Sequence, residues 1–152
     1  MVQQARRLVD LAKTEADRAG SSTIEAEHLL LAIASDDGSR AQALLASAGL
    51  SHYAITVALT QADNERVAPA GVRPERLAEL RATSERRRDA RIGRTTKTAL
   101  HHAVLSSDHQ PLEAEHVLIG VLSDDTGTVP RALEIAGVER ATLLARLRRA
   151  LS

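Results

Sequence analysis

Two glutamates of this sequence occur in the same tetrapeptide, 88 residues apart. Glu27 and Glu115 belong to Glu-Ala-Glu-His segments at 25–28 and 113–116, and the apolar pattern that follows each segment places it in the first turn of a helix. A carboxylate in the first turn of a helix can have either of two roles. It can complement the helix dipole and help cap the helix, or it can accept two charge-assisted hydrogen bonds from a ligand's guanidinium.

The histidines and aspartates near these glutamates could suggest a metal site. His28 and His116 each lack a second ligand four residues further on, and the chain has no cysteine, so we expect semi-buried imidazoles bonded to a backbone carbonyl or a carboxylate. The pairs Asp36-Asp37 and Asp124-Asp125 lack the remaining ligands of a calcium loop and are predicted to form turns between helices. The sequence therefore predicts no metal and no cofactor.

Enzyme motifs are missing from the sequence. The phosphate-binding pattern Gly-x-x-x-x-Gly-Lys-Ser/Thr does not occur, and neither Lys13 nor Lys97 follows a glycine-rich loop. Nucleophile-elbow and zinc-protease motifs are also absent, as is any cysteine nucleophile. We therefore expect a chain that is not an enzyme, has no catalytic residue and does not itself hydrolyse ATP.

The tetrapeptides belong to a longer internal repeat. Residues 24–59 and 112–147 align without a gap at a shift of 88, sharing Glu-Ala-Glu-His, Ser-Asp-Asp, a leucine and Ala-Gly. Helical periodicity and end signals predict four helices in each copy: 3–19, 25–35, 39–48 and 51–62, then 96–107, 113–123, 128–136 and 139–151. We expect one all-α unit over 1–152, a pseudo-twofold eight-helix bundle without a β-sheet.

The repeat also predicts which residues are buried and which end helices. Leu30, Ile33 and Leu45 should lie in one shared core with their counterparts, Leu118, Val121 and Leu133. Gly49 and Gly137 follow the third helix of each copy, where a left-handed residue commonly ends a helix.

The composition limits the classes of binding partner and the cellular compartment that we expect for the protein. Twenty basic and twenty acidic residues give a net charge of zero, and Tyr53 is the sole aromatic residue, so there is no stacking platform for nucleic-acid bases. The absence of cysteine, of a signal-peptide pattern and of an apolar run near the ~18 residues of a membrane helix favours a cytoplasmic protein without membrane contact.

Residues 63–94, between repeat 1 (1–62) and repeat 2 (95–152), form a linker of different character. It contains Pro69, Gly71 and Pro74, and a run of arginines at 86–88 with others at 81, 91 and 94. Interleaved acidic residues favour a solvated helix face. The alternative is a nucleic-acid-associated regulator that binds through these arginines.

The segments AEHLLLAI and AEHVLIGV, each followed by an acidic turn and an Ala-Gly end, resemble the N-terminal domain of Clp AAA+ chaperones of the ClpC/ClpA type. The segment ARRLVDLA at 5–12 resembles that family's first helix. The resemblance covers nearly the whole chain except the linker. Alanine stands at 26 and 114, where the family has threonine, and the usual residues before the first helix, including an aromatic one, are absent.

This resemblance implies a module that recruits substrates, peptides or adaptor proteins for a Clp-type unfoldase, here without the ATPase modules. A standalone decoy copy is an alternative form of the same role. It also implies phosphoarginine recognition through Glu27 and Glu115. A helix N-terminus beside each carboxylate would receive the phosphoryl group. A second expected surface is a peptide groove along the first helix, at Arg6, Val9 and Lys13.

Overall fold

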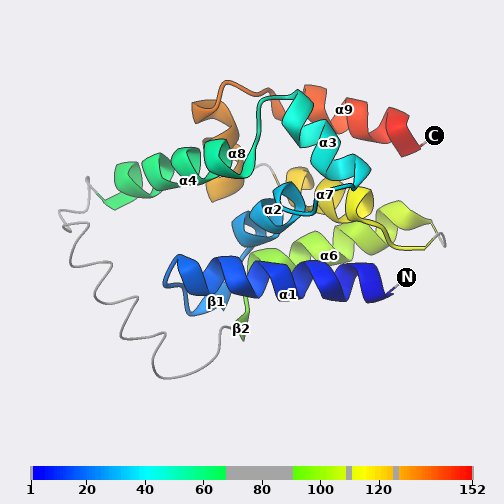
Figure 1. Ribbon diagram of the computed structural model, residues 1–152, viewed down its shortest axis with the longest axis horizontal. Helices are drawn as coiled ribbons and strands as arrows, with labels where there is room; N and C mark the ends of the chain where they lie inside the picture. Colours follow the sequence, from blue (N-terminus) through cyan, green and yellow to red (C-terminus); the bar gives the residue numbers. More distant parts are fainter. Residues whose placement is uncertain (1, 68–90, 109–110, 125–126, 152) are drawn as a thin grey trace.

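A computed structural model describes residues 2–67, 91–108, 111–124 and 127–151 of the chain (Figure 1). Its described elements are helices with one short strand pair: α1 (Val2–Arg18), β1 (Thr23–Ile24), α2 (Ala26–Ala34), α3 (Arg40–Ser47), α4 (His52–Val67), β2 (Arg91–Ile92), α6 (Arg94–Ser107), α7 (Ala114–Ser123), α8 (Thr128–Ile135) and α9 (Arg140–Leu151). The predicted eight helices are all present, and the all-α class is confirmed.

Helices α2 and α7 form the centre of the molecule and pack against each other (Figure 1). Both are apolar on almost every side, which is typical of helices surrounded by protein. All residues of α7 except Ser123, and all of α2 except Glu27, are buried. The predicted core positions are confirmed, since Leu30, Ile33 and Leu45 and their counterparts in the second copy are at most 1% exposed.

The third helix of each repeat ends in the same way. Gly49 and Gly137 have φ values of +81° and +76°, a left-handed conformation that glycine adopts without steric cost. The next residue closes the turn in both copies, because the N–H of Leu50 bonds the carbonyl of Leu45 at 2.8 Å and that of Val138 bonds Leu133 at 2.9 Å. The predicted helix ends are therefore confirmed.

A short strand pair is the main departure from the predicted fold. β1 and β2 run parallel, with Thr23 opposite Arg91 and Ile24 opposite Ile92. They precede α2 and α6 and do not occupy equivalent positions of the two repeats. The prediction of a fold free of β-sheet is wrong at this point. The pairing fixes the start of α6 beside the start of α2.

Helix α4 extends to Val67 and α6 begins at Arg94, so both ends of the predicted linker belong to helices. Arg91 lies in β2 and is exposed. The arginines at 81 and 86–88 that the sequence analysis singled out lie outside the described residues, as does Asp125.

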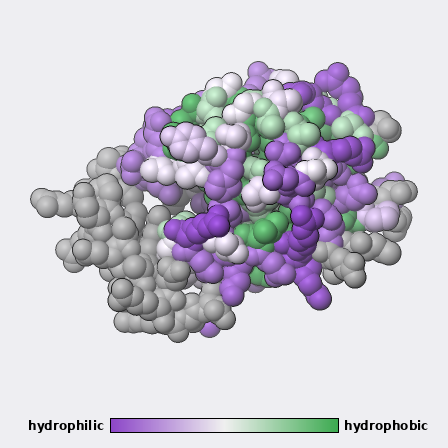
Figure 2. Space-filling model, viewed as in Figure 1, coloured by the Kyte–Doolittle hydropathy of each residue, from purple (hydrophilic) through white to green (hydrophobic). Residues whose placement is uncertain are grey.

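Within the described residues, no single helix is long and apolar enough to cross a membrane; α3 and α4 together have the length and composition, but they are bent by 66°. Figure 2 shows a largely hydrophilic face interrupted by apolar side chains. Among the residues whose side chains are described, the large apolar ones with substantial exposure are Tyr53, Val57, Ile92, Val104 and Leu105.

Candidate binding site at the repeat glutamates

The two Glu-Ala-Glu-His segments adopt the same local structure. Glu25 and Glu113 are the N-cap residues of α2 and α7. Their backbone N–H groups donate to Nδ1 of His28 at 2.9 Å and of His116 at 3.0 Å. Both rings are buried more deeply than the predicted semi-buried imidazoles, and the partner that they share is the backbone N–H of the N-cap residue. The histidines therefore complete a capping box, a role usually filled by Glu or Gln.

Glu115 is buried between the repeats, with 4% of its surface exposed. Its Oε1 accepts the backbone N–H of Ala41, at the start of α3, at 3.2 Å. Its Oε2 lies 3.9 Å from the guanidinium of Arg40, which is also 3.5 Å from Glu113. Burial raises the pKa of Glu115, the nearby Glu113 carboxyl adds to the rise, and the positive charge of Arg40 opposes it.

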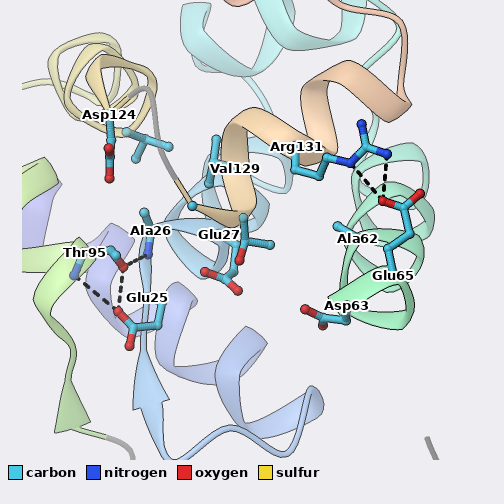
Figure 3. A pocket seen from close by; sticks show the side chains of 13 residues that line it. Glu25, Ala26, Glu27, Ala62, Asp63, Glu65, Thr95, Asp124, Val129 and Arg131 are labelled. Atoms are coloured by element: carbon cyan, nitrogen blue, oxygen red, sulfur yellow. Dashed lines mark hydrogen bonds and ion pairs between the residues drawn. The ribbon is translucent and has the colours of Figure 1, made fainter. Parts of the chain in front are cut away.

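Glu27 lies in a different setting, although the repeat made the two sites look alike. It is partly exposed and lines a cavity of about 710 Å³. Side chains from α2, α4, α6, α7 and α8 and from the adjoining turns surround this cavity (Figure 3): Glu25, Ala26, Glu27, Ala62, Asp63, Glu65, Thr95, Val121, Asp124, Gly127, Thr128, Val129 and Arg131.

The lining of the Glu27 cavity is predominantly acidic. Carboxylates come from Glu25, Glu27, Asp63, Glu65 and Asp124, whereas Arg131 is the basic residue among the described lining. Arg131 is already engaged, because its guanidinium lies 2.7 Å from Glu65 and 3.0 Å from Glu134. In Figure 3 the carboxylates of Glu25, Glu27 and Asp63 lie around the same space. Among the described lining residues, acidic side chains therefore outnumber basic ones.

Thr95, in the first turn of α6, fixes one wall of the cavity. Its hydroxyl donates to Glu25 Oε1 at 2.5 Å and accepts the backbone N–H of Ala26 at 2.8 Å (Figure 3). Thr23 donates to the other oxygen of Glu25 at 2.9 Å. Sequence reasoning did not identify Thr95 as a site residue, because only the β1–β2 pairing brings α6 to this position.

The residues of the expected peptide groove lie elsewhere. Arg6, Val9 and Lys13 occupy one side of α1 at helical spacing; Arg6 is exposed, whereas Val9 packs against the core. None of them lines the Glu27 cavity. The groove on α1 stays a prediction, separate from the cavity.

In the part of the chain that is described, no three or more His, Asp or Glu side chains are placed so that they could hold a metal ion together.

Comparison with known proteins identifies the family. Residues 1–104 match the model of the Clp repeat (R) N-terminal domain. Among solved structures, the N-terminal domain of the caseinolytic protease-associated chaperone ClpD from Arabidopsis thaliana is similar in fold, with a TM-score of 0.69 and 21% identity over 98% of this chain and 95% of that chain. No curated protein matches by sequence. Since the family model covers more than half of its length, the chain belongs to the Clp repeat N-terminal domain family.

Proposed function

We propose that this domain binds polypeptides, either substrates or adaptor proteins of a Clp-type ATPase, and that the Glu27 cavity holds an arginine-type side chain of the bound partner. The observation that carries the proposal is the acid-lined cavity of about 710 Å³ beside the start of α2. Membership of the Clp repeat family supports the recruiting role. A standalone decoy copy would use the same cavity to compete for partners of the full-length motor.

The arrangement of the cavity matches the chemistry of a guanidinium. A carboxylate accepts two parallel N–H bonds from this planar group, and Glu27 is flanked by Glu25 and Asp63 (Figure 3). Gly127, Thr128 and Val129 add the N-terminal end of α8 to the lining. Backbone N–H groups at such an end attract anions, so phosphoarginine could present its guanidinium to Glu27 and its phosphoryl group to α8.

Thr95 lies beside position 26, where this chain departs from the family pattern. Alanine replaces the usual threonine at position 26, which removes a hydroxyl from the start of α2. The Thr95 hydroxyl lies against the backbone N–H of Ala26 at 2.8 Å, and Thr95 is part of the cavity lining. We therefore propose that Thr95 supplies the polar group that position 26 lacks.

Calorimetric titration with phosphoarginine, and separately with N-acetylarginine amide, tests this proposal. A charge-assisted hydrogen bond contributes roughly 1.5–3 kcal/mol, so Glu27→Gln should weaken binding about tenfold or more. Asp37→Asn is the matched control, because Asp37 is an exposed carboxylate outside the cavity, and its affinity should equal that of the wild type. Equal binding by the wild type and Glu27→Gln would refute the proposed site. The two ligands together show whether the phosphoryl group adds affinity.

A further inference from the structure

Residues 91–107 carry positive charge and no negative charge. This segment contains Arg91, Arg94, Lys97 and two histidines, and neither aspartate nor glutamate occurs in it. It comprises β2 and all of α6, which follows β2 directly (Figure 1). Because the whole chain has a net charge of zero, the segment is a local excess of positive charge on the domain.

One side of α6 combines this charge with exposed apolar side chains. Its exposed residues recur at helical spacing, and we call this set the α6 face: Arg94, Lys97, Thr98, His101, Val104 and Leu105. The exposed fractions of Val104 and Leu105 are 58% and 63%. The α6 face is therefore basic toward the start of the helix and apolar toward its end.

The two cations of the α6 face have no carboxylate partner in the described part of the chain. Neither Arg94 nor Lys97 forms an ion pair with a described carboxylate. In contrast, Arg7, Arg40 and Arg131 each form an ion pair with a carboxylate far along the chain. Within the described residues, the fold therefore pairs those arginines and leaves the charge of the α6 face available to another molecule.

The corresponding helix of the first repeat does not share this pattern. At the shift of 88 that aligns the repeats, Thr98 and Leu105 correspond to Asp10 and Asp17 of α1. The same helix in the same architecture therefore accommodates acidic side chains at these two positions. The acid-free and partly apolar character of the α6 face is thus a feature of this helix that the repeat fold does not require.

We infer that the α6 face is a docking surface for an acidic segment of a partner protein, with an apolar anchor beside its carboxylates. Charge complementarity places the carboxylates against Arg94 and Lys97. The apolar anchor lies on Val104 and Leu105, because its contact with them removes apolar surface from water. Lys97 and Leu105 are about 12 Å apart along the helix axis, a distance that an extended peptide spans in about four residues.

This docking surface goes beyond the proposed function. No residue of the α6 face lines the Glu27 cavity, and the ligand expected here is acidic, whereas the one proposed for the cavity is an arginine-type side chain. A polypeptide fits the α6 face better than a nucleic acid does. Residues 91–107 include no Phe, Tyr or Trp on which a base could stack, and phosphate groups would gain nothing from Val104 and Leu105.

NMR titration with the acetylated and amidated peptide Asp-Glu-Gly-Ser-Gly-Leu-Leu, and with its reversed sequence, tests this inference. The amide shifts should be largest on α6. Arg94→Glu combined with Lys97→Glu should weaken binding about fivefold or more, because two exposed attractions become repulsions. Leu105→Ser should weaken binding about tenfold, because the apolar anchor loses its contact with a leucine.

The variants should remain folded, because the replaced side chains are exposed and acidic residues near the start of a helix are favourable; circular dichroism checks this. Arg149→Glu is the control for the change in charge, and Val57→Ser is the control for the loss of an exposed apolar side chain. Both replaced residues are exposed on other helices, α9 and α4. Both control variants should bind the peptides as the wild type does.

Three results would overturn the inference. The first is that the wild type binds neither peptide, and the second is that the charge-reversed variant binds as well as Arg149→Glu. The third is tighter binding of a single-stranded DNA heptamer than of the peptides at the same salt concentration, which would assign the α6 face to nucleic acid. Since the peptides contain no arginine, their failure to bind would leave the proposed role of the Glu27 cavity untouched, and the reverse also holds.

Discussion

Leu30→Ala and Leu118→Ala should each lower the free energy of unfolding by about 2–5 kcal/mol, the range for truncating a fully buried leucine. Both side chains are 0% exposed, one in each repeat, and both belong to the same apolar core. Each substitution should therefore move a single unfolding transition of the whole domain. Chemical denaturation followed by circular dichroism measures both the free energy and the number of transitions.

Leu105→Ala is the matched control, because this leucine is 63% exposed on α6 and surface substitutions usually change stability by less than about 0.5 kcal/mol. Two separate transitions, with each leucine variant affecting only one, would contradict a core shared by the repeats. If Leu30→Ala and Leu118→Ala lowered the free energy of unfolding no more than Leu105→Ala does, these two leucines would not be packed in the core.

Gly120→Ala should destabilise the domain by about 1–3 kcal/mol, the usual cost of forcing an extra methyl into a packed interior. A β-carbon at Gly120 would collide with the backbone carbonyl of Ala99 on α6, and backbone cannot move aside as a flexible side chain can. In a solvent-exposed helix the same change would stabilise the protein by roughly 0.5–1 kcal/mol. The sign of the effect therefore reports on the contact between α6 and α7.

The first repeat provides a direct comparison for the effect of alanine at position 120. The counterpart of Gly120 in the first copy is Ala32, which is fully buried in α2, so the sequence alone would predict that alanine is tolerated at 120. Thermal unfolding of Gly120→Ala, compared with Ala32→Gly, distinguishes the two expectations. Ala32→Gly should lose about 1 kcal/mol from helix propensity. A gain in stability for Gly120→Ala would show that the helices are not closely packed there.

The sequence predicted the helices well because their signals are local. Apolar residues at helical spacing marked α2 and α7, and glycines at 49 and 137 marked the ends of α3 and α8. The gapless register then indicated that Glu27 and Glu115 are equivalent. These features depend on residues a few positions apart, or on a comparison of the chain with itself.

The features that the sequence did not predict depend on contacts between distant segments. β1 and β2 are two residues each and lie 68 residues apart along the chain, too short for any alternation to mark them. Without that pairing, nothing places Thr95 beside Glu25. The difference between Glu27 and Glu115 likewise arises where α3 of one repeat meets α7 of the other. Arg40 can be read from the sequence, but its position beside Glu113 and Glu115 cannot.

Binding at the Glu27 cavity can be located by following backbone amide shifts by NMR during a titration with phosphoarginine. The largest shifts should fall on Ala26, Glu27, Thr95 and Val129, which surround the cavity, and Glu27→Gln should abolish them at the same ligand concentration. Shifts confined to α1, at Arg6, Val9 and Lys13, or no shifts at all, would show that the Glu27 cavity is not the binding site.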